Sequence, residues 1–458
     1  MKRSLAVASC VCAVLLAGCT VGPKYHRPAV NAPNQYYNAP PGPALPNSLG
    51  NEKWWTIFED PVLQNLIRTA IRKSYDVRIA ASQVLQAQAQ VGLARANQFP
   101  SFSAGPGLMS ESIPGFATLN IIELIGTFSY NFDFWGQYRR ATEAARAALL
   151  SSEWNRREVI ATAVSNVATA YFQIRALDLQ LSIYEKTLAD EREYLKLTQK
   201  LYDYGTDTLL DVRQAQQLVD SAAAAISQTD IQIKQQEDLL STLLGENPQQ
   251  IPRGWPLTSE PLPPAIPPGL PSALLERRPD ILAAEQQLVS ANAEIGVARA
   301  QFFPSLPLTG YGGAGSSALR KLFSGSSWTW NSNPTLTQPV FTGGRLKSNL
   351  KLVKAQQQQA LLTYQQTIQQ AFRQVSDALA AYQKYGEYRR QEASLAAAAG
   401  DAAHLSGVLY RAGAVSFLQV LTNETNYLSA QITLAQADLD ERLSLVQLYI
   451  ALGGGWEQ

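Results

Sequence analysis

Histidine and cysteine, the side chains that most often bind metals or act as nucleophiles, are scarce in this sequence. Its 458 residues include two histidines, His26 and His404, and three cysteines, which all lie within the first 19 positions. A metal site or a thiol–imidazole pair needs several such side chains in one place, so we expect no metal, no cofactor and no enzymatic activity. Lysine and arginine total 38 against 37 acidic residues, a balance that excludes a protein held to nucleic acid by phosphate neutralisation.

One cysteine, Cys19, stands where a covalent modification is expected. A positively charged start and an apolar run from Leu5 to Leu16, too short to cross a bilayer, are typical of a secretory signal. The run Leu16-Ala17-Gly18-Cys19 resembles a bacterial lipobox, which implies a signal peptide over residues 1–18 and acylation of Cys19. Thr20 follows where aspartate would retain a lipoprotein at the inner membrane. The alternative is an ordinary signal peptide cut near an alanine.

The chain that follows contains an internal repeat. Residues 94–101, Ala-Arg-Ala-Asn-Gln-Phe-Pro-Ser, recur almost unchanged at 298–305, and further matches continue to the end of the chain at a separation of 208. A unit of this length is too long for a solenoid repeat and indicates a duplicated domain. We expect a first repeat over 61–247 and a second over 272–458.

Each repeat ends in a long segment without proline, residues 136–247 and 340–458. Such segments, rich in alanine, glutamine and leucine, favour helix. Gly205 and Gly413 interrupt them and predict turns between antiparallel helices, with a first helix over 137–202. Apolar residues from Ile160 to Leu188 recur every three or four positions, which predicts a coiled-coil seam. An isolated helical rod would explain this seam equally well.

Short segments between the helices alternate apolar and polar residues, as half-buried strands do. We expect strands at 127–135 and 327–341, and weaker ones at 102–108 and 306–311. The aromatic residues expected on one face are Phe128, Tyr130, Phe132, Phe134, Trp328 and Trp330. If that face meets lipid, four strands cannot close a barrel, and several chains must share one. The alternative is a hairpin on a soluble sheet.

Two proline-rich stretches complete the plan. Residues 19–60 form an expected N-terminal tether, and residues 248–271 an expected linker between the repeats. Disordered linkers are the alternative for both.

The sequence resembles the outer membrane factors of tripartite efflux systems, the TolC/OprM family, in its lipoprotein branch. The resemblance covers nearly the whole mature chain. The motifs that carry it are Val21-Gly22-Pro23-Lys24-Tyr25, Trp54-Trp55 with Phe58, Arg277-Arg278-Pro279-Asp280, Ala298-Arg299-Ala300 before Phe303-Pro304, and Gly343-Gly344-Arg345.

This resemblance implies a mainly α protein with a small transmembrane β part. Duplicated helical hairpins would form an α-barrel tunnel, and four strands per chain would contribute to a shared, trimeric, 12-stranded β-barrel. The implied partners are two further subunits, a periplasmic membrane fusion (adaptor) protein, an inner membrane transporter of the RND type and the lipid of the outer membrane, with no nucleic acid.

The resemblance also implies a gate at the periplasmic hairpin turns. Asp211 matches the gate aspartate of the family, and Tyr410 and Arg411 match residues that bind across the closed tip. Asp207 and Glu424 complete the expected set. The family's second aspartates are missing, because Gln419 and Thr422 occupy their places. The alternative makes Asp207 a helix cap and Arg411 a solvated charge.

The expected function is a passive exit duct for small molecules such as drugs, lipid-anchored in the bacterial outer membrane and extending into the periplasm. The same fold could serve type I protein secretion. A structural coiled-coil adaptor of the periplasm is an alternative from another class.

Overall fold

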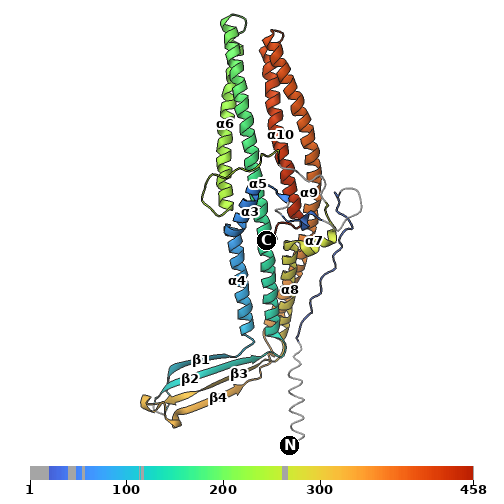
Figure 1. The fold of residues 1–458 in the computed structure, drawn as a ribbon. Helices are drawn as coiled ribbons and strands as arrows, with labels where there is room; N and C mark the ends of the chain where they lie inside the picture. Colours follow the sequence, from blue (N-terminus) through green and yellow to red (C-terminus); the bar gives the residue numbers. More distant parts are fainter. Residues whose placement is uncertain are drawn as a thin grey trace. The chain divides into compact units, whose positions relative to one another are not determined.

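The computed structural model describes residues 20–39, 48–53, 57–112, 114, 118–259 and 267–456. Cys19, Trp54 and Trp55 lie outside the described residues. Figure 1 shows a mainly helical chain with one sheet. The helices are α3 (Pro61–Lys73), α4 (Tyr75–Ala96), α5 (Gln137–Asp203), α6 (Leu209–Leu243), α7 (Pro271–Arg277), α8 (Pro279–Ala300), α9 (Arg345–Arg411) and α10 (Phe417–Ala451). The strands are β1 (Ser101–Glu111), β2 (Leu119–Phe132), β3 (Leu306–Ser316) and β4 (Trp328–Pro334).

The chain forms two compact units, each built from three segments of the sequence. Unit 1 comprises residues 1–30, 83–153 and 283–366, and unit 2 comprises residues 31–82, 154–282 and 367–458. Helices α4, α5, α8 and α9 each run from one unit into the other. Among the described residues, no helix combines the length and apolar character that crossing a membrane requires.

Unit 1 contains a four-stranded antiparallel sheet in the order β1-β2-β3-β4. Its central pair, β2 and β3, joins the two repeats of the sequence. Phe128 pairs with Phe102 on one side and with Gly310 on the other, and Trp330 pairs with Gly312 in the next row of the same face. The pairing therefore places the aromatic residues of β2 and β4 on one face, as the alternation predicted.

The extents of all four strands differ from the prediction: β1 and β3 are longer than expected, and β2 and β4 are shifted or shortened. Strand β2 begins at Leu119 and ends at Phe132, so that Phe134 lies in the turn that follows. Residues 119–126 carry apolar side chains on both faces, so a search for strict alternation does not find them. Strand β4 ends at Pro334 instead of residue 341, although backbone hydrogen bonds to Pro307 and Ser305 continue as far as Thr337.

The N-terminal segment packs against the helices of unit 1 as an ordered strap. The backbone N–H of Val21 donates to the carbonyl of Trp135 at 3.0 Å. Gly22 has a φ of +117° and lies so close to Gly296 of α8 that a Cβ would come within 2.5 Å of its Cα. The Tyr25 hydroxyl donates to Glu285 at 3.1 Å. These contacts hold Val21, Gly22 and Tyr25 against α8 and the segment before α5.

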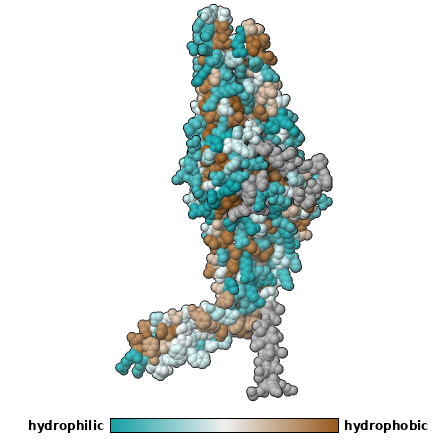
Figure 2. Space-filling view, viewed as in Figure 1, coloured by the Kyte–Doolittle hydropathy of each residue, from teal (hydrophilic) through white to brown (hydrophobic). Residues whose placement is uncertain are grey.

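The two helical hairpins, whose turns lie in unit 2, have matched lengths. Helices α5 and α9 each have 67 residues, and α6 and α10 each have 35. Figure 2 shows hydrophobic residues in narrow stripes along these helices, between hydrophilic ones. Every residue of the apolar stripe predicted on α5, from Ile160 to Leu188, is buried or half-buried. The structure therefore confirms that this stripe faces other parts of the protein.

The Arg-Arg-Pro-Asp motif has a structural role in unit 2. The buried guanidinium of Arg278 donates to both carboxylate oxygens of Asp280, at 2.9 and 2.6 Å. It also donates to the carbonyl of Ala451, at the end of α10, and to the side chain of Gln374. One arginine thus caps the last turn of α10 and links it to α8 and α9.

Candidate functional site

The first hairpin turn is built around a glycine and a capping box. Gly205 has a φ of +77°, which favours glycine. The Thr208 hydroxyl and the Asp211 carboxylate bond to each other's backbone N–H, and the two side chains also bond directly at 2.6 Å. Asp211 therefore stabilises the start of α6 together with Thr208. The Asp207 side chain takes no part in this capping box.

The second hairpin turn carries Tyr410 into contact with the first. Gly413, with a φ of +70°, forms the turn one residue after the exposed Ala412. Tyr410 is 5% exposed and packs with Ala215, Phe417 and Val420 in a small apolar cluster. Its hydroxyl donates a hydrogen bond to the Asp207 carboxylate.

Burial and the neighbouring Asp207 carboxylate raise the pKa of Tyr410 well above that of a free phenol. The phenol is therefore neutral and remains a donor over the whole physiological range. The partner of Tyr410 is Asp207, and Asp211 contributes through its charge only. The structure thus joins two of the predicted gate residues across the two hairpins.

Arg411 is exposed at the end of α9, beside an open cavity of about 850 Å³ that Glu424 also lines. Among the described residues, no carboxylate lies within ion-pair distance of its guanidinium. Gln419 and Thr422 are exposed and bond only within α10, to Asn423 and to the Leu418 carbonyl. No carboxylate replaces them at these positions.

Glu424 belongs to a second cluster, one that the sequence analysis did not predict. The Tyr194 hydroxyl of α5 donates to Glu424 of α10 at 3.2 Å. Glu191, one turn earlier on α5, is 3% exposed, and its Oε2 has no hydrogen-bond partner within the described part of the chain.

The pKa values of this cluster are shifted upwards. Burial and the charge of Glu424 raise the pKa of Glu191 to about 8, and burial raises that of Glu424 as well. Burial and Glu424 raise the pKa of Tyr194 to about 12. Glu191 is therefore mostly protonated at neutral pH, which allows two carboxyl groups to approach each other at the contact between the hairpins.

The sequence did contain a signal for Glu191. The apolar stripe of α5 runs in steps of three and four through Tyr184 and Leu188, and the next step falls on Glu191. An acidic residue at a seam position must be paired or protonated when it is buried.

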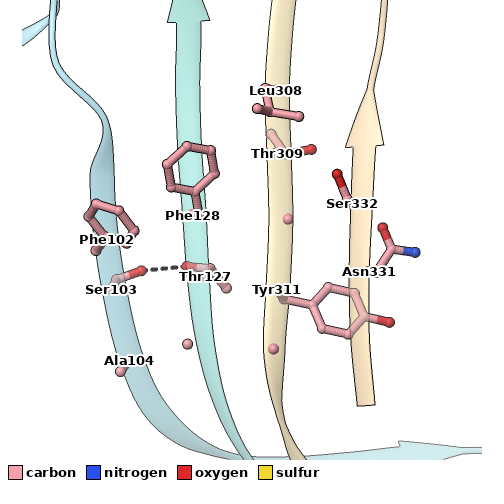
Figure 3. Close-up of a pocket in the computed structure, with 13 residues that line it drawn as sticks. Phe102, Ser103, Ala104, Thr127, Phe128, Leu308, Thr309, Tyr311, Asn331 and Ser332 are labelled. Atoms are coloured by element: carbon pink, nitrogen blue, oxygen red, sulfur yellow. Dashed lines mark hydrogen bonds between the residues drawn. The ribbon is translucent and has the colours of Figure 1, made fainter. Parts of the chain in front are cut away.

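The sheet of unit 1 has most of its aromatic side chains on one face and hydroxyl and amide side chains on the other, where Tyr311 lies beside Thr127 and Asn331. Phe102 and Phe128 lie beside each other with ring centroids 5.1 Å apart, while Ser103 and Thr127 form a 2.6 Å hydrogen bond on the other face (Figure 3). The ring of Phe132 lies between those of Tyr130 and Phe134, with ring centroids 4.9 Å and 5.6 Å apart.

Trp328 and Trp330, on β4, share the aromatic face and are 69% and 74% exposed. A strand that lies between lipid and water has apolar side chains on one face and polar ones on the other. The aromatic face and the hydroxyl and amide groups opposite it match this pattern.

Comparisons with known proteins agree with this geometry. The family model described as "Outer membrane efflux protein" matches residues 66–246 and 270–454. The chain is 35% identical over 452 residues to the cation efflux system protein CusC of Escherichia coli, covering 97% of this chain and 98% of that protein. It is 36% identical over 468 residues to the probable efflux pump outer membrane protein TtgC of Pseudomonas putida, covering 100% and 96%. The open state of the MtrE outer membrane channel of Neisseria gonorrhoeae matches with a TM-score of 0.87 at 31% identity, covering 96% of this chain and 99% of that chain.

Duplicated long hairpins attached to a sheet with one aromatic and one polar face define an outer membrane channel subunit. The match to the family model covers most of the sequence. The chain belongs to the outer membrane efflux protein family and is the outer membrane channel of an efflux system.

Proposed function

We propose that three copies of the chain assemble into a passive duct that carries small molecules across the periplasm and the outer membrane. The observation that carries the proposal is the sheet, whose outer strands β1 and β4 each have a neighbour on one side only within the described residues. Unpaired backbone groups are too costly in lipid for such an edge to remain open. Pairing β4 of one copy with β1 of the next satisfies both edges, and three copies give twelve strands.

In this assembly the aromatic face contacts the lipid acyl chains, and the polar face lines the water-filled lumen of the barrel. The residues proposed for the lipid face are Phe128, Tyr130, Phe132, Phe134, Trp328 and Trp330. The two sequence repeats, 61–247 and 272–458, supply two strands and one long hairpin each to every subunit. The tether 19–60 and the linker 248–271 connect these parts.

The hairpin turns form the periplasmic gate in this proposal. Tyr410 and Asp207 hold the two hairpins of a subunit together, and Asp211 shapes the turn that presents Asp207. Arg411, exposed and near the turn, is free to meet a carboxylate of a neighbouring subunit. Glu424, with Tyr194 and Glu191, forms a second contact between the hairpins further along α5. An open gate requires these contacts to break.

Partners are proposed from the same reasoning. A passive duct has no energy source, so a transporter in the inner membrane must drive transport; the family resemblance implies an RND-type transporter and a membrane fusion protein that connects the two. CusC is a component of a cation efflux system, and TtgC of an efflux pump, which supports such an assembly. Acylation of Cys19 would anchor the chain in addition to the strands. Thr20, the residue after Cys19, lies against Gly136 between β2 and α5.

The test is to purify the full chain in detergent, measure its mass by native mass spectrometry and record its conductance in planar bilayers. We expect a trimer that conducts ions at a low level. A folded, stable monomer would overturn the shared barrel, and a trimer that never conducts would overturn the duct.

A further inference from the structure

The start of α9 carries an unusual charge. Between Glu294 and Asp377 the chain has no acidic residue at all, and it has eight basic ones. Four of these, Arg345, Lys347, Lys351 and Lys354, lie in the first three turns of α9. The N-terminus of a helix has a partial positive charge, so bases there are unfavourable unless an anion compensates them.

The first repeat has acidic partners for its bases at the position that corresponds to the start of α9. At a separation of 208 residues, Lys347 corresponds to Arg139 at the start of α5. There Arg139 binds Asp133, through its backbone N–H at 2.9 Å and its side chain at 3.4 Å. Arg140 binds Glu143 at 2.8 Å. Arg139 and Arg140, at the start of α5, are therefore neutralised inside their own repeat, whereas Arg146, the counterpart of Lys354, has no ion pair among the described residues.

Both acidic partners are absent from the second repeat. The position of Asp133 is occupied by Phe341, and that of Glu143 by Lys351. Phe341 is 90% exposed, and its neighbour Val340 is 93% exposed. The second repeat thus replaces two carboxylates by an exposed apolar residue and a further base.

The four bases are exposed, and none of their side chains has an ion pair or hydrogen bond to any described residue. Lys347, Lys351 and Lys354 follow the spacing i, i+4, i+7 and share one face of α9. Exposed apolar side chains therefore lie within a few residues of a stripe of three lysines, all in unit 1 and directly after β4.

We propose that the start of α9 binds the phosphate of an anionic membrane phospholipid, with Phe341 and Val340 against its acyl chains. The inference rests on the proposed placement of the sheet in the membrane, since that placement puts residues 335–354 at the membrane boundary. An apolar surface next to lysines matches a phospholipid, whose phosphate lies beside its hydrocarbon. A free anion or an acidic protein segment would be matched by the lysines but not by the exposed Phe341.

The test uses the detergent-purified, lipid-stripped oligomer of the full chain. Phosphatidylglycerol or phosphatidylcholine is added, and the retained lipid is counted by native mass spectrometry. We expect preferential retention of phosphatidylglycerol. The variant K347Q/K351Q/K354Q should bind it roughly one hundredfold more weakly, because each base near an anionic lipid contributes about a factor of five. Replacing the same three lysines by arginine should preserve binding.

The matched control removes three exposed bases elsewhere, in the variant K186Q/R192Q/R213Q, and should bind like the wild type. If the triple lysine variant does not assemble, the single change Lys351→Glu restores the acid that the first repeat has and should also weaken binding. Equal retention of the two lipids, or unchanged retention in the lysine variants, would overturn the proposal.

Two further outcomes would also reject it. If inorganic phosphate displaces phosphatidylglycerol at equal concentration, the site serves free anions. If the lysine variants change only the ion selectivity of the channel, the lysines line the water path. The duct is tested separately, because an oligomer that retains phosphatidylglycerol without conducting refutes the duct alone, and a conducting oligomer without lipid preference refutes the lipid site alone.

Discussion

Replacing Glu191 by glutamine removes a buried carboxyl group from the contact between the two hairpins while preserving its size. In the native protein this group is 3% exposed, and its Oε2 has no hydrogen-bond partner among the described residues. Burial comes first among the causes that raise its pKa to about 8, followed by the charges of Glu424 and Asp190. The bases that line the adjoining cavity are Lys196, Lys200, His404 and Arg411.

The sign of the effect follows from linkage between protonation and folding. The pKa of Glu191 is raised in the folded state, from 4.5 to about 8, so the folded chain binds a proton more tightly than the unfolded chain between those values. Stability contributed by this group is complete below about pH 4.5 and is lost as the pH rises towards 8. At about 1.4 kcal/mol per pH unit, the loss is at most about 5 kcal/mol per subunit.

The assay is the thermal midpoint of the purified oligomer between pH 5 and pH 9, followed by circular dichroism. The wild-type midpoint should fall with rising pH, and Glu191→Gln should flatten the profile and raise the midpoint at pH 8. Glu185→Gln, an exposed glutamate on the same helix, is the control and should behave like the wild type. A Glu191→Gln profile as steep as that of the wild type would refute the assignment of the titrating group.

Three further predictions concern the gate, the sheet and the anchor. Tyr410→Phe and Asp207→Asn should each raise single-channel conductance in planar bilayers, because a hydrogen bond to a charged group contributes about 1.5–3 kcal/mol; unchanged conductance in both would mean that apolar packing alone closes the tip. Asp211→Ala should mainly lower the thermal midpoint, since loss of a helix cap costs about 1 kcal/mol. Phe132→Asp should abolish the oligomer on unheated gels, because it puts a charge on the lipid face, whereas Asn131→Asp should be tolerated; equal tolerance would contradict the assignment of faces. Cys19→Ser should remove the acyl chains, and mass spectrometry that finds a mature N-terminus other than Cys19 would contradict the lipobox.

The long helices could be predicted because their signals are local. Segments without proline, a glycine at each turn and the spacing of apolar residues located α5 to within one residue of its observed ends and placed α9 between residue 340 and the turn at Gly413. Strand β2 was predicted too short at its start, since Ile121, Ile122, Leu124 and Ile125 give no alternation. Where both faces of a strand are apolar, a period of two disappears from the sequence.

The partner of Tyr410 could not be predicted in the same way. Asp207 and Asp211 are both acidic and both lie near the turn, and only the relative register of the two hairpins decides which of them meets the hydroxyl. That register depends on side-chain packing between segments more than 200 positions apart. The capping box could be read locally, since Thr208 and Asp211 have the required spacing, and it offered an independent reason to assign Asp211 to the helix start.

The matched lengths of the hairpins limit how this sequence can change. One residue added to α9 alone would move Tyr410 by about 1.5 Å along its axis and turn it by about 100°. Its hydroxyl would then miss Asp207, although every contact within α9 itself could be kept. Insertions and deletions in the helices are therefore acceptable only in pairs, one in each repeat. The separation between the repeats changes from 204 to 208 in the sheet segment, where a loop can absorb four residues without moving either turn.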